Sequence, residues 1–137
     1  MSYKGFAKSG YTTIPINSSL SVEKTGKGIL KTIGIAIDGS SSYTGDTHLV
    51  VKIDGVTQID MSQGFVYQSI TPQDWNKLPF SAGDLTLAAL DPVTDYIFRF
   101  RWKVNLPFTT SAEVLLVPPT DISGVDARIL IDGIEEV

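Results

Sequence analysis

The sequence predicts an all-β protein, a single-domain, jelly-roll-like β-sandwich with about eight to ten antiparallel strands and at most one short helical turn. Two observations predict this fold class. Apolar and polar residues alternate over many short segments, and glycine, proline or aspartate separates these segments at short intervals. In addition, 137 residues with a hydrophobic fraction of 42% suit one globular domain with a core of its own.

The clearest alternation lies in residues 96–104. Aromatic residues take one set of positions: Phe98, Phe100 and Trp102. Basic residues take the other set: Arg99, Arg101 and Lys103. Successive side chains of a strand point to opposite faces of the sheet, so we expect an aromatic face in the core and a basic face in solvent. Like charges about 7 Å apart repel one another. We therefore expect acidic groups across the basic row, either Glu113 of the next strand or an acidic segment of a second copy.

The chain begins with a segment, residues 1–10, that combines glycine and serine with lysines and aromatic residues. Its charged and aromatic members are Tyr3, Lys4, Phe6 and Lys8. Such a segment has too little apolar surface for a core, so we expect a flexible arm that either docks on a neighbouring copy or frays. Residues 11–137 then form the sandwich domain.

The remaining elements follow from periodicity and turn residues. Strands are predicted at residues 11–16, 20–24, 29–38, 49–53, 56–60, 65–70, 85–90, 96–104, 113–117 and 127–137, the last as one strand or a closing hairpin. Asp54-Gly55 predicts a two-residue hairpin. Residues 105–111 are expected to form a loop through Pro107, and residues 71–75 a short helical turn. Ile-Asp-Gly recurs at residues 37–39, 53–55 and 131–133, which we interpret as repeated turn chemistry.

Residues for catalysis and metal binding are scarce. The chain has no cysteine, and His48 is its one histidine, so neither a nucleophilic triad nor a zinc site is expected. The loop between Asp38 and Asp46 lacks the carboxylate density of calcium-binding loops. The sequence therefore predicts a protein that is not an enzyme and that uses no metal or cofactor.

The net charge of −4 and the pI near 4.8 argue against nucleic acid as a partner. No apolar run approaches the roughly 20 residues that span a membrane. The charge is unevenly placed: residues 1–31 are rich in lysine, and residues 121–137 are rich in acids. Either both ends are solvated surface, or the basic end of one copy meets the acidic end of another, including Glu135 and Glu136.

Three segments, residues 26–33, 51–56 and 85–117, resemble small β-sandwich proteins of tailed bacteriophage particles. The resemblance implies a head decoration, cement or tail-associated protein that forms a homo-oligomer, most often a trimer. It implies the major capsid protein or another virion protein as partner, and a location in the virion after synthesis in the host cytoplasm. The interface residues expected under this hypothesis are Tyr3, Lys4, Phe6, Lys8, Arg99, Arg101, Lys103, Glu135 and Glu136.

The alternative hypothesis is a carbohydrate-binding or receptor-binding module at a tail or baseplate tip. Sandwich folds often present an aromatic residue on a loop for stacking against a sugar. Trp75 and Tyr43 are the candidates, although Trp75 is also suited to closing one end of the sandwich.

Overall fold

The structure of the protein is a computed structural model that describes residues 2–14, 18–38, 48–62, 85–91, 97–117 and 125–137. These residues contain nine strands: β1 (Tyr3–Ile14), β2 (Leu20–Thr25), β3 (Gly28–Asp38), β4 (His48–Ile53), β5 (Val56–Ser62), β6 (Leu85–Asp91), β7 (Ile97–Phe108), β8 (Ser111–Val117) and β9 (Val125–Glu136). No helix in this part of the chain is long and apolar enough to cross a membrane. The predicted all-β class is confirmed.

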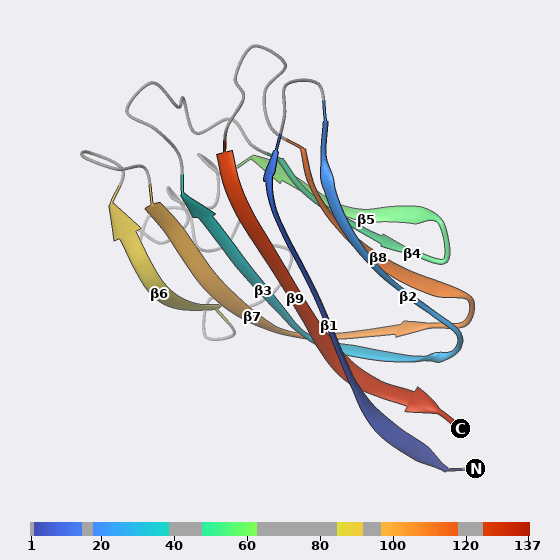
Figure 1. The fold of residues 1–137 in the computed structure, drawn as a ribbon. Helices are drawn as coiled ribbons and strands as arrows, with labels where there is room; N and C mark the ends of the chain where they lie inside the picture. The colour runs from blue at the N-terminus through green and yellow to red at the C-terminus, as the bar shows by residue number, and fades with distance from the viewer. Residues whose placement is uncertain (1, 15–17, 39–47, 63–84, 92–96, 118–124) are drawn as a thin grey trace.

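The strands form two antiparallel sheets (Figure 1). The five-stranded sheet has the order β1-β9-β3-β7-β6, and the four-stranded sheet has the order β2-β8-β4-β5. The pairs are nested along the chain, since β1 pairs with β9, β2 with β8, β3 with β7, and β4 with β5. This wound ribbon is a double-sheet jelly roll, in which β6 extends the first sheet beside β7.

The core lies between the sheets and follows the alternation of the strands. In β8, Ala112, Val114 and Leu116 are buried and the residues between them are more exposed. In β7, Trp102 is fully buried, while Arg101 and Lys103 are exposed. The predicted division of this strand into a core face and a solvent face is therefore confirmed at these residues. The side chains of three others lie outside the described part: Phe98, Arg99 and Phe100.

The first strand begins at Tyr3 and not at Tyr11. Residues 3–10, predicted to be a flexible arm, instead pair with β9 in an unbroken antiparallel register. The backbone explains the difference, because β9 presents an equally long row of N–H and C=O groups. Pairing with β9 provides hydrogen bonds for the backbone groups of glycine and serine as well as for those of any other residue except proline. Phe6 adds a packing contact, with its ring 6.2 Å from that of Phe108 in an edge-to-face arrangement.

Two predicted turns are strand in the structure. Pro107 lies inside β7, where β6 no longer runs alongside, since the β6 pairing reaches only to Trp102. Among the described strands Pro107 has a partner on one side alone, Ile29 of β3, and sheets tolerate proline at such edge positions. Gly133 lies inside β9, so of the two forms predicted for residues 127–137 the single strand is confirmed, and residues 131–133 do not form a turn. A Cβ at Gly133 would collide with the carbonyl oxygen of Ile29, so this glycine permits close strand packing.

The hairpin at Asp54-Gly55 is confirmed. Asp54 and Gly55 both have positive φ, 53° and 81°, as a type I′ turn between β4 and β5 requires. The strand predicted at residues 65–70 and the helical turn predicted at residues 71–75 lie outside the described residues.

Candidate assembly surfaces

Arg101 and Lys103 of the basic row in β7 lie on the outer side of the five-stranded sheet. Arg101 is opposite Gly34 of β3, and Lys103 is opposite Thr32. Lys31 stands beside them, and its Nζ donates to Asn105 Oδ1 at 2.9 Å. We call Lys31, Thr32, Gly34, Arg101 and Lys103 the basic face. Arg99 lies opposite Ala36 in the same register.

No carboxylate of the described residues forms an ion pair with Arg101 or Lys103. Asp132 lies in the same cross-strand row as Lys103 but two strands away, about 10 Å at ordinary strand spacing. Glu113, predicted as a partner within the fold, lies in β8 of the other sheet. Within the described residues, the nearest carboxylate in this row is therefore too distant for an ion pair with the basic face.

The outer side of the four-stranded sheet carries charge of the opposite sign. Glu23 of β2 and Glu113 of β8 are directly opposite one another. Ser21 Oγ donates to Glu113 Oε2 at 2.8 Å, and Lys52 of β4 is opposite Glu113. Like charges in directly opposite positions repel. We call Ser21, Glu23, Lys52, Asp60 and Glu113 the acidic face.

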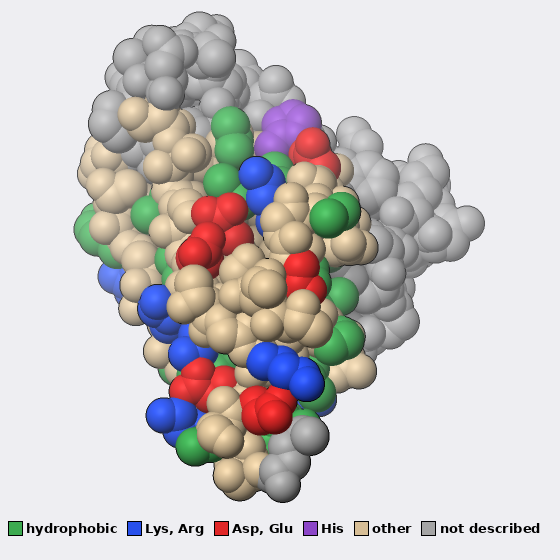
Figure 2. Space-filling model, turned by 90° about the vertical axis from the view of Figure 1, so that its right-hand side faces the viewer, with side chains coloured by type: hydrophobic (Ala, Val, Ile, Leu, Met, Phe, Trp, Pro, Cys, Tyr) green, Lys and Arg blue, Asp and Glu red, His purple; other side chains and the backbone are tan. Residues whose placement is uncertain are grey.

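Figure 2 looks onto the side of the molecule where β2, β8, β4 and β5 lie, and acidic side chains stand over its middle. His48 of β4 contacts the neighbouring strand of this sheet, since its Nδ1 lies 2.8 Å from Asp60 Oδ1 of β5. Both of these side chains are exposed, so this pair is worth little to stability.

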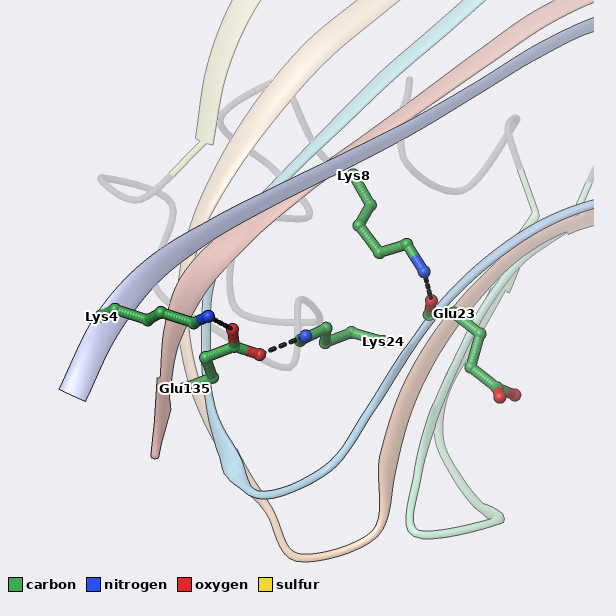
Figure 3. Close-up of polar contacts among 5 residues, drawn as sticks. All are labelled: Lys4, Lys8, Glu23, Lys24 and Glu135. Carbon is green, nitrogen blue, oxygen red and sulfur yellow. Dashed lines mark hydrogen bonds and ion pairs between the residues drawn. The ribbon is translucent and has the colours of Figure 1, made fainter. Parts of the chain in front are cut away.

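A second cluster forms where β1, β2 and β9 meet, at the end of the sandwich that holds both termini (Figures 1 and 3). Glu135 lies between two lysines: Lys4 Nζ is 3.3 Å from its Oε1, and Lys24 Nζ pairs with its Oε2. The hydrogen bond from Lys24 lowers the pKa of Glu135 below its ordinary value; partial desolvation opposes this shift, and Lys4 reinforces it. Lys24 also stands 5.5 Å from the centre of the Phe6 ring, a cation–π contact.

Further contacts extend this terminal cluster. Lys8 Nζ donates to the carbonyl oxygen of Glu23 at 2.8 Å, which joins β1 to the edge of β2 (Figure 3). Lys27 Nζ lies 3.3 Å from Glu136 Oε2. Tyr3 remains half-exposed at the start of β1.

The lysines and carboxylates of this cluster meet within one chain. The antiparallel pairing of β1 with β9 brings the basic beginning of the sequence against its acidic end. Seven of the nine predicted interface residues divide into two groups; Tyr3 is half-exposed, and the side chain of Arg99 lies outside the described part. Lys4, Phe6, Lys8, Glu135 and Glu136 contact other parts of the same chain, whereas Arg101 and Lys103 stand on an open sheet face.

Asp54 is the best-coordinated carboxylate of the described residues. It accepts hydrogen bonds from the backbone N–H groups of Thr109, Thr110 and Ser111, at 2.7–3.1 Å, and from both threonine hydroxyls at 3.0 Å. The N–H groups of Thr110 and Ser111 hold the pKa of Asp54 far below its ordinary range. The β4–β5 turn is thereby fastened to the β7–β8 turn.

The residues of the carbohydrate hypothesis, Tyr43 and Trp75, lie outside the described part of the chain. The same holds for the loop of residues 39–47 considered for calcium. Among the residues that the structure does describe, no group of three potential metal ligands comes together.

The acidic face is not marked by any pattern in the sequence. Glu23 and Glu113 are far apart in the sequence, and neither was marked by a motif. The alternation around Val22 and Val114 indicates that both glutamates point outward, but only the pairing of β2 with β8 places them side by side.

No protein-family model matches the chain, and no curated protein matches its sequence significantly. Among solved structures, the chain is similar to dimeric latent PorU from Porphyromonas gingivalis, with a TM-score of 0.51 and 8% identity over 99% of this chain. It is also similar to the PBCV-1 virus capsid (TM-score 0.48, 8% identity, 99% of this chain). A third similarity is to PliG, a periplasmic inhibitor of g-type lysozyme from Aeromonas hydrophila, with a TM-score of 0.36 and 13% identity over 96% of this chain.

The chain spans 13% of the PorU chain, 43% of the capsid chain and 86% of PliG. At 8% identity, the likeness to PorU concerns the fold alone. The other two similarities have lower TM-scores.

Proposed function

We propose that the protein is a non-enzymatic structural component of a tailed bacteriophage particle that decorates or cements the capsid as a homo-oligomer, with a trimer favoured. Its partners are other copies of itself and the major capsid protein or another virion protein. Its place is the virion, after synthesis in the host cytoplasm.

The basic face is the observation that carries this proposal. Arg101 and Lys103 project from an open sheet face and have no carboxylate partner among the described residues. Gly34 and Ala36 beside them are small, so a second protein surface can approach the backbone closely. A cationic face of this kind suits association with an acidic protein surface. The jelly roll is compatible with a structural role because viral capsid domains use it, but it also serves lectins and cupins.

Co-sedimentation with empty capsids tests the proposal. The capsids are assembled from the major capsid protein that the reading frames flanking the gene of this chain are expected to encode. The expected result is that the protein pellets with the capsids in a saturable manner and is absent from the pellet without them. Light scattering of the purified protein is expected to give a mass that is a multiple of 14.8 kDa. A strict monomer that stays in the supernatant with capsids present contradicts the proposal.

A further inference from the structure

The two outer faces of the sandwich carry opposite charge. The basic face contains Lys31, Arg101 and Lys103 on β3 and β7. The acidic face contains Glu23 and Glu113 side by side on β2 and β8, with Lys52 as the one cation among its named residues. These two charge groups belong to different sheets, so they lie on opposite sides of the core.

We propose that the basic face of one copy docks on the acidic face of the next copy. This inference rests on the self-association in the proposed function and names the surface that carries it. Complementary potentials speed the encounter of two surfaces and exclude partners of the wrong charge. Here the same chain carries both the basic face and the acidic face. We therefore infer that the partner of the basic face is a second copy of the chain.

The spacing of the charges suits such contacts. Arg101 and Lys103, two residues apart on one strand, are separated by about 7 Å. Glu23 and Glu113, opposite one another on neighbouring strands, are separated by about 5 Å. In the isolated chain each pair places like charges together, with Lys52 as the one cation opposite Glu113, and the contact proposed here brings further opposite charges against both pairs.

The flat centre of the basic face allows the approach. Thr32, Gly34 and Ala36 alternate with the buried isoleucines of β3 and therefore point outward. Gly34 has no side chain, and a methyl group there would have Leu130 of the neighbouring strand as its nearest neighbour, at an ordinary contact distance of 3.5 Å.

The geometry makes the contact heterologous, because each copy contributes two different surfaces. A heterologous contact produces a closed ring when its rotation closes and an open chain when it does not. The mass of the assembly distinguishes a ring, which includes the favoured trimer, from an open chain.

Salt dependence of the wild-type protein is the first test. Sedimentation velocity is measured at about 0.1 M and about 1 M sodium chloride, where the Debye length falls from about 10 Å to about 3 Å. We expect oligomers at low salt and a marked shift towards monomer at high salt. An oligomer equally stable at both concentrations contradicts the charge-based contact, and this result does not depend on any variant folding correctly.

Two complementary charge reversals give the second test. Arg101→Glu with Lys103→Glu makes both faces acidic, and Glu23→Lys with Glu113→Lys makes both faces basic. Neither variant is expected to self-associate, with a dissociation constant raised roughly a hundredfold or more by like-charge contact. An equimolar mixture of the two is expected to associate again, in even-numbered assemblies in which the two variants alternate, since each supplies the charge that the other lacks. Circular dichroism checks that both variants are folded.

A single pair of substitutions controls for net charge. Arg101→Glu and Lys27→Glu change the charge of the protein equally, but Lys27 lies in the turn between β2 and β3 and pairs with Glu136. We expect Lys27→Glu to assemble as the wild type does and Arg101→Glu to be impaired.

The outcomes separate this inference from the proposed function. The contact proposed here is refuted if either folded reversal variant still assembles alone, or if mixing the two variants does not restore assembly. Self-association of the wild type stands in both cases. If the wild type itself is monomeric at low salt, the self-association in the proposed function fails as well.

Discussion

Gly133 offers the sharpest test of how β1, β3 and β9 pack together. We expect Gly133→Ala to destabilise the fold strongly, because the added Cβ would collide with the Ile29 carbonyl oxygen and stand 3.0 Å from the Phe6 ring. The carbonyl belongs to the β3 backbone, so relief requires the paired strands to move apart. Overpacking of this kind costs about 2–3 kcal/mol, or roughly 6 to 12 °C in Tm for a chain of this length.

Gly34→Ala is the matched control for this prediction. It makes the same chemical change on a neighbouring strand of the same sheet, but its Cβ would make an ordinary contact, 3.5 Å from Leu130 Cβ. We expect its Tm to equal or slightly exceed that of the wild type, since alanine restricts the unfolded chain more than glycine does. Thermal melting followed by circular dichroism, with urea unfolding, measures both variants at about 1 M sodium chloride, where the contact through the basic face is screened. The reasoning fails if Gly133→Ala melts within about 2 °C of Gly34→Ala, a difference well below the expected shift.

Two further predictions concern carboxylates with lowered pKa values. Asp54→Asn is expected to lower the urea midpoint relative to Asp60→Asn. The loss of stability should be complete at pH values above the ordinary aspartate pKa of about 3.9, and it should shrink as the pH falls towards the folded-state pKa of Asp54. The reason is that a carboxylate with a depressed folded-state pKa stabilises the fold only while it is ionised. A difference in urea midpoint between the two variants that does not change with pH contradicts this prediction. Glu135→Gln should lower Tm more than Glu136→Gln, since Glu135 bridges two lysines, and high salt should narrow that gap; equal Tm values would count against the bridge.

The fold class and most strand positions could be predicted because alternation and turn chemistry are local signals. The burial of Trp102 beside exposed Arg101 follows from the period of a strand. The hairpin at Asp54-Gly55 follows from the few residues that adopt positive φ. Neither conclusion requires knowledge of a distant partner.

The beginning of the chain could not be predicted in this way. Residues 3–10 contain glycine and serine and have little apolar surface, so their local sequence indicates a flexible segment. They become a strand because β9, more than a hundred residues away in sequence, offers an edge of the same length. The same long-range pairing turns Gly133 from an expected turn residue into a site of close packing.

The basic row shows why neighbours in sequence are poor guides to partners in a jelly roll. Glu113 follows Lys103 by one hairpin-like connection, which made it the natural candidate for neutralising the row. That connection instead crosses from one sheet to the other, because β7 pairs with β3 while β8 pairs with β2 and β4. Glu113 is thereby carried to the opposite side of the core. The crossing separates the charges of two consecutive strands onto two faces, and this separation gives one chain both halves of a complementary contact.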